Sequence, residues 1–190
     1  MFDLQFSTPP SWAEFVTKNL DDFLLDHAAC ERKASATAMS FVVKYRDRPQ
    51  LVSKMITVAQ EELEHFAQVT EIIHQRGLQL SKDTKDPYVN ALLQRARHSP
   101  RERLIDRLLI FGIIEGRGCE RFQLLADSLD DPSLRDFYHN LVRAEAKHHA
   151  AFLHLVRKEA PEKEWRSRLR ELLAEEGSIV SSLPIRAALH

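Results

Sequence analysis

The sequence has little glycine, little cysteine and almost no net charge, and each shortage excludes a class of protein. Only five glycines occur in 190 residues and few segments alternate between apolar and polar residues, so helix is favoured over sheet. The two cysteines, Cys30 and Cys119, form no C-x-x-C pair. Without such a pair no rubredoxin-type or iron–sulfur module is expected. Two cysteines in predicted helices do not indicate a disulfide scaffold, and a reducing cytoplasm is the simplest location. A net charge of -1 gives no argument for nucleic-acid binding from bulk charge.

Long hydrophobic runs are also missing. The longest apolar run, residues 108–114, is too short to cross a bilayer, so we expect no membrane span. Residues 1–12 lack the charged and apolar regions of a signal peptide. A hydrophobic content of 44% and a charged content of 29% fit a globular protein, and the length predicts a single domain over residues 1–190.

Apolar residues spaced three and four apart predict four long helices, at about residues 22–45, 49–74, 99–129 and 132–160. Gly77 is expected to end the second helix, and Ser99 and Pro100 to start the third.

Shorter helices are predicted around these four. One begins at Ser11, where Glu14 completes a capping box. Another follows Pro87, and a last amphipathic helix runs from Pro161 to about Glu176, with the final dozen residues as a tail.

The lengths of the connections predict how the long helices are arranged. The first and second helices are joined by a short turn, as are the third and fourth, so each pair is an antiparallel hairpin. About twenty residues separate the two hairpins, which is enough to run back along a bundle. The predicted fold is therefore all-α, a ferritin-like four-helix bundle with one long crossover and extra short helices.

Acidic residues and histidines interrupt the apolar stripes of the four helices. The motifs Glu62-x-x-His65 and Glu145-x-x-His148 each follow a lone glutamate one helix earlier, Glu31 and Glu115 respectively. One glutamate, then E-x-x-H, repeated twice, is the ligand pattern of a carboxylate-bridged site for two metal ions in a helical bundle.

The motif alone is weak, because roughly 0.8 matches are expected by chance in a chain of this composition. A third match, Glu71-x-x-His74, falls off its stripe beside Ile72, the apolar residue that we expect to end the stripe of the second helix. We expect this third match at the surface. Two matches on core stripes, each with a partner glutamate, are much harder to obtain by accident.

Charge balance sharpens the prediction. Four carboxylates in a bundle core would each cost several kcal/mol or be neutralised by a raised pKa, whereas two divalent cations balance them. Carboxylate and imidazole ligands suit iron or manganese better than zinc or copper. In the usual arrangement Glu62 and Glu145 bridge the metals, but the sequence does not fix which glutamates bridge, nor iron against manganese.

Three glycines surround Glu115, namely Gly112, Gly116 and Gly118. They provide either room for O2, a substrate or a π-bulge, or close approach of a neighbouring helix, and the two alternatives are equally supported.

Several other polar side chains stand near the predicted ligands. His27, on the stripe before Glu31, is a ligand-supporting group, a polar lining residue or an ordinary core histidine. Tyr138 is expected to be a core tyrosine rather than a redox tyrosine, and His149 lies off the stripe and is left out.

An arginine cluster comprises Arg95, Arg97, Arg101, Arg103 and Arg107. Acidic residues are interspersed, so a salt-bridged solvent face is favoured over a rim that contacts phosphate groups.

Four segments resemble tRNA hydroxylases of the MiaE type, over about residues 12–176. The metal motif is shared with ferritins, rubrerythrins and manganese catalases, whereas the glycines beside Glu115 and the overall length narrow the resemblance. The segments are Cys30–Ala34, Glu61–Phe66, Ile114–Arg117 and Arg143–His149.

This resemblance implies an enzyme that inserts one oxygen atom of O2 into an allylic methyl of a 2-methylthio-isopentenyl-adenosine beside the tRNA anticodon. It implies two iron ions, a separate reductase or ferredoxin-type electron donor, and a monomer or small oligomer. Phe111, Phe122 and the three glycines would line the pocket for the prenyl tail. The alternative is a ferroxidase or peroxide-reducing protein, as in ferritins or rubrerythrins, and a ferritin cage would need 24 chains.

Overall fold

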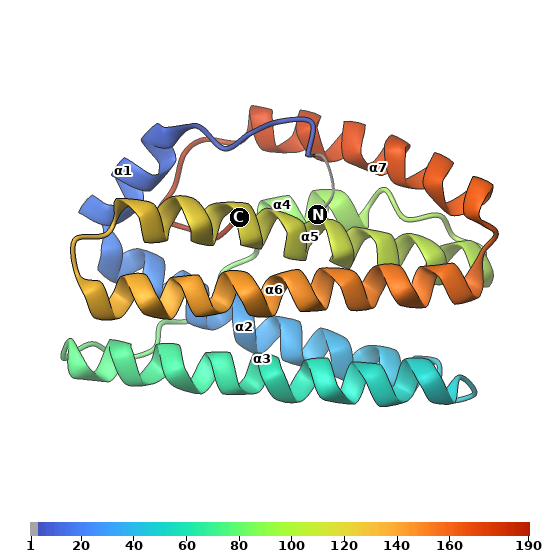
Figure 1. The fold of residues 1–190 in the computed structure, drawn as a ribbon, viewed down its shortest axis with the longest axis horizontal. Helices are drawn as coiled ribbons and strands as arrows, with labels where there is room; N and C mark the ends of the chain where they lie inside the picture. Colours follow the sequence, from blue (N-terminus) through green and yellow to red (C-terminus); the bar gives the residue numbers. More distant parts are fainter. Residues whose placement is uncertain (1–3) are drawn as a thin grey trace. The chain divides into compact units, whose positions relative to one another are not determined.

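The computed structural model describes residues 4–190, which form seven α-helices and no strand, so the all-α prediction is confirmed (Figure 1). The helices are α1 (Pro10–Lys18), α2 (Leu20–Lys44), α3 (Pro49–Gln75), α4 (Pro87–Leu93), α5 (Pro100–Ser128), α6 (Pro132–Glu159) and α7 (Glu162–Ser182). Two long helical hairpins with a connector that carries α4 follow the chain order predicted for a ferritin-like bundle.

These residues fall into two compact units. The α2–α3 unit comprises residues 18–84 and 187–189, and the α5–α6 unit comprises residues 4–17, 85–186 and His190. The expectation of a single domain over residues 1–190 stays a prediction.

Helices α2 and α3 lie side by side as a hairpin in the first of these units (Figure 1). The buried face of α3 includes Met55, Val58, Val69 and Ile73. The expectation that Ile72 ends this stripe is wrong, because Ile73 is buried and Ile72 is only half-buried. A straight α-helix drifts by about 20° per heptad against a repeat of 3.5 residues, and over the five turns from Met55 this drift shifts the buried position from Ile72 toward Ile73.

The end of α3 follows the prediction closely. Gly77 has a φ of 75°, its N–H donates to the His74 carbonyl at 2.9 Å, and the Leu78 N–H donates to the Ile73 carbonyl at 3.1 Å. Glycine adopts this left-handed conformation without the steric cost that a Cβ imposes, and it closes the helix as a Schellman-type cap.

Helix α5 is the central element of the α5–α6 unit, where it contacts α4, α6 and α7. All residues from 111 to 119 are buried, although the sequence predicted only one buried stripe. A helix that is buried on every side has neighbours on every side. This environment accounts for the continuous apolar run at residues 108–114.

Prolines set most helix starts. Pro49, Pro87, Pro100 and Pro132 all occupy a first helical position, where the missing N–H removes no hydrogen bond. The same rule corrects the first helix, which begins at Pro10 and not at a Ser11 cap.

The predicted C-terminal end is wrong in two respects. Helix α7 continues past Glu176 to Ser182, and Ala188 and Leu189 are buried instead of forming a loose tail. Buried Ile179 and Val180 extend the apolar face of α7 beyond Gly177, a residue type that usually signals a helix end. A Cβ at Gly177 would lie 3.5 Å from Gln5 Cβ, so this glycine allows close approach of the N-terminal segment.

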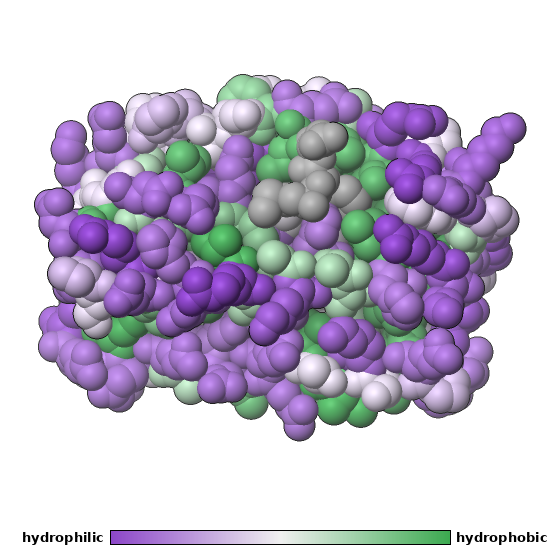
Figure 2. All heavy atoms as spheres, in the orientation of Figure 1, coloured by the Kyte–Doolittle hydropathy of each residue, from purple (hydrophilic) through white to green (hydrophobic). Residues whose placement is uncertain are grey.

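Hydrophilic side chains cover most of the face drawn in Figure 2, with apolar side chains scattered between them. None of the helices in residues 4–190 combines the length and apolar character that a membrane crossing requires.

Candidate metal centre

Three of the six predicted ligands come together inside the α2–α3 unit. Glu31 on α2 and Glu62 and His65 on α3 are all buried. His65 Nδ1 lies 3.6 Å from Glu31 Oε2 and 3.6 Å from Glu62 Oε2. The i, i+3 spacing places Glu62 and His65 on one face of α3, so both side chains project toward Glu31.

His27 stands directly behind this group. Its Nε2 lies 2.6 Å from Glu31 Oε1, and both side chains are buried. Burial raises the pKa of Glu31, but the charge and hydrogen bond of His27 outweigh it and, with His65 and Glu62, lower the pKa to about 2. Glu31 is therefore a carboxylate that accepts a hydrogen bond from His27 Nε2–H. Of the three roles left open for His27, support of a ligand fits this contact best.

The other three predicted ligands are buried in the α5–α6 unit, Glu115 on α5 and Glu145 and His148 on α6. His148 Nδ1 lies 3.6 Å from Glu145 Oε2, the same separation as in the first group. A Cβ built at Gly118 would lie 3.9 Å from Glu145 Cγ, so this glycine faces a predicted ligand. The sequence repeat therefore corresponds to a repeat of local geometry.

These separations suit a cation better than direct hydrogen bonds. An N···O distance of 3.6 Å exceeds the 2.7–3.2 Å of N–H···O hydrogen bonds. It is short enough for one ion to lie between the two atoms, because imidazole and carboxylate bind divalent ions at about 2.0–2.2 Å. The donor set of oxygen and imidazole nitrogen suits iron or manganese. By contrast, Glu71 and His74 of the third motif are exposed, as predicted.

The residues predicted to line a substrate pocket lie on α5, and all are buried: Phe111, Gly112, Gly116, Gly118 and Phe122. The Phe111 ring lies 6.1 Å from that of Phe152, and the Phe122 ring lies 5.5 Å from that of Tyr138. Tyr138 is fully buried, as the core assignment predicts. The pocket itself stays a prediction.

His149, which the stripe pattern left out, is a buried residue that links two helices. Its Nδ1 lies 2.9 Å from the Gly112 carbonyl oxygen of α5, and burial lowers its pKa. The spacing of apolar residues does not identify His149, because this residue lies on a different face of α6 from the predicted ligands.

The arginine cluster is largely engaged with carboxylates of its own unit. Arg97 contacts Asp106 at 2.7 Å, Arg101 contacts Glu164 at 2.8 Å and Arg95 contacts Glu175 at 3.3 Å; the partners of the last two lie on α7. Contact with RNA was predicted for four members of this cluster, and it stays a prediction for Arg95, Arg97, Arg101 and Arg103.

Sequence reasoning missed a second buried charged group, centred on Arg117. This side chain donates to Glu176 of α7 at 2.9 Å and to the Phe6 carbonyl at 2.8 Å, and Glu176 also accepts from Tyr88. Burial lowers the pKa of Arg117, but Glu176 and Glu120 outweigh it and raise the pKa overall. This network ties α4, α5, α7 and the N-terminal segment together.

A family model described as tRNA-(MS[2]IO[6]A)-hydroxylase (MiaE) matches residues 2–190. A tRNA 2-(methylsulfanyl)-N(6)-isopentenyladenosine(37) hydroxylase of Pseudomonas putida is 36% identical, over 78% of this chain and 72% of that protein. A Salmonella typhimurium protein of the same name is 31% identical, over 80% and 74%. A solved structure from Synechococcus, described as having aldehyde deformylating oxygenase activity, is 33% identical with a TM-score of 0.95, covering 100% of this chain and 96% of that one.

Proposed function

Because this chain belongs to the MiaE family of tRNA hydroxylases, we propose that it hydroxylates the isopentenyl group of a 2-methylthio-isopentenyl-adenosine in tRNA. It is a monooxygenase with a non-haem di-iron centre. The family match over residues 2–190 and two relatives whose names state this hydroxylation support the proposal. The same match favours hydroxylation over the ferroxidase or peroxide-reducing alternative.

The observation that carries the metal assignment is the repeated geometry of a buried glutamate and histidine at 3.6 Å. We propose that two iron ions bind six residues: Glu31, Glu62, His65, Glu115, Glu145 and His148. Four carboxylates balance two divalent cations, so the pattern explains why four acidic groups are retained in buried positions.

When bound, the two iron ions supply the reduction of O2 and the transfer of one oxygen atom into a C–H bond. The balance requires two electrons and two protons from outside, and the second oxygen atom leaves as water. A separate reductase or ferredoxin-type protein is the proposed electron donor.

The side chains of this chain hold and shield the reacting centre. His27 keeps Glu31 ionised and oriented. Gly118 leaves room beside Glu145, and Phe111 and Phe122 provide apolar walls for the prenyl tail. An apolar, water-poor pocket favours attack on the aliphatic group over side reactions with water.

The proposed substrate base lies in the single-stranded anticodon loop, from which a base can be splayed out and inserted into a pocket. Arg103 is exposed, and the neighbouring arginines remain within reach of solvent. We propose this cluster as the phosphate contact. The reaction would take place in the cytoplasm, where tRNA is available, with the enzyme as a monomer or small oligomer and not a 24-chain cage.

A direct test combines the iron-loaded protein, a prenylated anticodon stem-loop, 18O2 and a reductant. The expected product carries one 18O atom in the prenyl group, detected by mass spectrometry of the nucleosides. An unprenylated stem-loop and a Glu62→Ala variant are the controls, and neither should gain oxygen. Failure of the prenylated substrate to gain oxygen, with iron bound and reduced, would contradict the proposal.

The Synechococcus structure favours a second candidate, an oxygenase that acts on an aldehyde. The same protein preparation can be incubated with a long-chain aldehyde under identical conditions. Release of the carbonyl carbon from the aldehyde, without any oxygen gain by the stem-loop, would favour this candidate.

A further inference from the structure

A cavity of about 170 Å³ lies within the α5–α6 unit and uses none of the predicted metal ligands. The segment before α1, α1 itself, one side chain of α5 and the end of α7 with the residues that follow it form its walls. Arg121, Arg186 and His190 line it, and no Asp or Glu occurs among its described lining residues. The two arginines therefore carry the formal charges of the described lining side chains, and Glu120, outside the lining, accepts from Thr8 Oγ1 at 2.7 Å.

Arg121 is the buried member of this group, with 9% of its surface exposed. Its Nε donates to Thr8 Oγ1 at 3.4 Å, and its guanidinium carbon lies 5.2 Å from the centre of the Trp12 ring. Burial, followed by the positive charge of Arg117, lowers the pKa of Arg121 to about 10. A buried positive charge of this kind is stabilised when an anion binds beside it.

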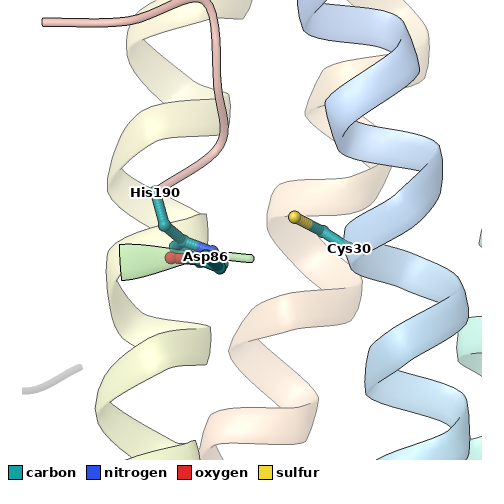
Figure 3. Close-up of side chains that lie close together, drawn as sticks. All are labelled: Cys30, Asp86 and His190. Atoms are coloured by element: carbon teal, nitrogen blue, oxygen red, sulfur yellow. The ribbon is translucent and has the colours of Figure 1, made fainter. Parts of the chain in front are cut away.

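Arg186 and His190 are held together at another side of the cavity. Arg186 Nη2 donates to the main-chain oxygen of His190 at 3.0 Å. His190 lies beside Asp86 (Figure 3). Its Nδ1 is 3.1 Å from Asp86 Oδ2, and its ring stacks on Tyr88 with 5.1 Å between the ring centres. These contacts restrict the two side chains before any ligand arrives, which lowers the entropy that binding must offset.

The remaining walls are mostly apolar and include Phe6, Trp12, Leu183 and Ile185. The volume is below the roughly 300–1,000 Å³ of pockets for drug-sized ligands. It is close to that of an engineered apolar cavity of about 150 Å³ that binds benzene. A ligand of this site therefore has a body about as large as one aromatic ring.

We propose that this cavity binds a small organic anion, with a compact apolar body against Trp12 and a carboxylate or phosphate head toward Arg121 and Arg186. The apolar walls select against inorganic anions, and the arginines select against neutral molecules of the same shape. This site is separate from the proposed hydroxylase centre, and its existence does not depend on that function.

The test uses the iron-loaded full chain with benzoate and phenyl phosphate as probes and benzamide as the uncharged match of benzoate. Binding is measured by titration calorimetry and by saturation-transfer NMR of the probe. We expect one probe anion to bind with one site per chain, and benzamide to bind at least about tenfold more weakly because it lacks the charged head. Which of the two anions binds more tightly distinguishes a carboxylate ligand from a phosphate ligand.

Matched variants locate the binding. Ser181 lines the cavity, whereas Ser178, one turn earlier on α7, is exposed and does not line it. Ser181→Trp should block the probe, and Ser178→Trp should leave its affinity unchanged. Arg186→Gln should lower the affinity for the probe anion about tenfold or more and leave the affinity for benzamide unchanged.

Circular dichroism checks that each variant is folded. If Arg186→Gln is unstable, Ser181→Trp still tests the site, because this variant keeps both arginines. Benzoate could also bind to the iron ions, because carboxylates are iron ligands. Binding of the probe anion that is unchanged in Ser181→Trp would show that it binds outside the cavity, and this would overturn the proposal. Equal affinity for benzoate and benzamide, or binding of neither anion at millimolar concentration, would overturn it as well.

Discussion

His27 Nε2 lies 2.6 Å from Glu31 Oε1, so a histidine outside the predicted ligand set holds a carboxylate inside it. Groups that hydrogen-bond to metal ligands fix their orientation, and their loss typically lowers metal affinity 10–100-fold. We expect His27→Ala to weaken iron binding by about this factor without unfolding the protein. Titration of the metal-free protein with ferrous iron measures the change.

His74→Ala is the matched control, because His74 belongs to the exposed third motif on α3. Its iron affinity should equal that of the wild type. Equal iron affinity in His27→Ala and the wild type would show that Glu31 needs no support from His27.

Gly118 is predicted to tolerate alanine but not a larger residue. A Cβ at this position would lie 3.9 Å from Glu145 Cγ, an ordinary van der Waals distance. Gly118→Ala should therefore keep its iron and gain about 0.5–1 kcal/mol in free energy of unfolding, because glycine is unfavourable within a helix. Gly118→Leu adds atoms toward Glu145 and should lose iron. Metal analysis and urea unfolding of both variants check this, and iron loss in folded Gly118→Ala would contradict it.

Glu176 is predicted to be the most important single carboxylate for stability in the α5–α6 unit. It is fully buried and pairs with Arg117, whose side chain is also fully buried. Removing one partner of a buried pair leaves the other charge uncompensated and typically costs about 3–5 kcal/mol. Because Arg117 also contacts Glu120, we expect Glu176→Gln to cost about 3 kcal/mol, near the lower end, measured by urea unfolding.

The neighbouring Glu175 provides the control. Its side chain is 45% exposed and pairs with the exposed Arg95, so Glu175→Gln should cost at most about 1 kcal/mol. Similar losses in the two variants would show that burial of the Arg117–Glu176 pair has no energetic consequence.

Asp86 predicts a pH dependence of stability. Burial raises its pKa, but the hydrogen bond and charge of His190 and the backbone N–H of Val89 outweigh it and lower the pKa from 3.8 to about 2. A depressed carboxyl pKa stabilises the fold above pH 3.8, and this stabilisation is lost as the pH falls toward 2. It amounts to about 2 kcal/mol at neutral pH and roughly half of that at pH 3.

The comparison is between the wild type and Asp86→Asn, in which the amide oxygen can still accept from the Val89 N–H at the start of α4. Urea unfolding in the presence of chelator gives the free-energy difference between them at pH 7 and at pH 3. The difference should shrink at pH 3, and a difference that is constant with pH would contradict the assignment.

The long helices and the pairing of Glu62 with His65 were predictable because both follow from spacing along one helix, and the short turn between α2 and α3 makes a hairpin that brings Glu31 to them. Glu62 and His65 are three residues apart, and the structure places both beside Glu31. The helix starts at Pro49, Pro100 and Pro132 were also predictable from the sequence, because proline favours the first helical position whatever packs against the helix.

Features that depend on tertiary packing were not predictable. The burial of α5 on all sides, the His149 contact with Gly112 and the Arg117–Glu176 pair join segments that are far apart in the sequence. The extension of α7 beyond Gly177 was missed for the same reason, since the glycine accommodates the N-terminal segment and does not end the helix.

The most direct test of the central claim is a count of iron atoms per chain. The wild type reconstituted with ferrous iron should hold two, by elemental analysis, with a Mössbauer spectrum of a coupled pair. His65→Ala and His148→Ala should each lose iron, whereas His74→Ala should keep two atoms. A wild-type protein that stays metal-free, or an iron content that is unchanged in His65→Ala and His148→Ala, would contradict the account.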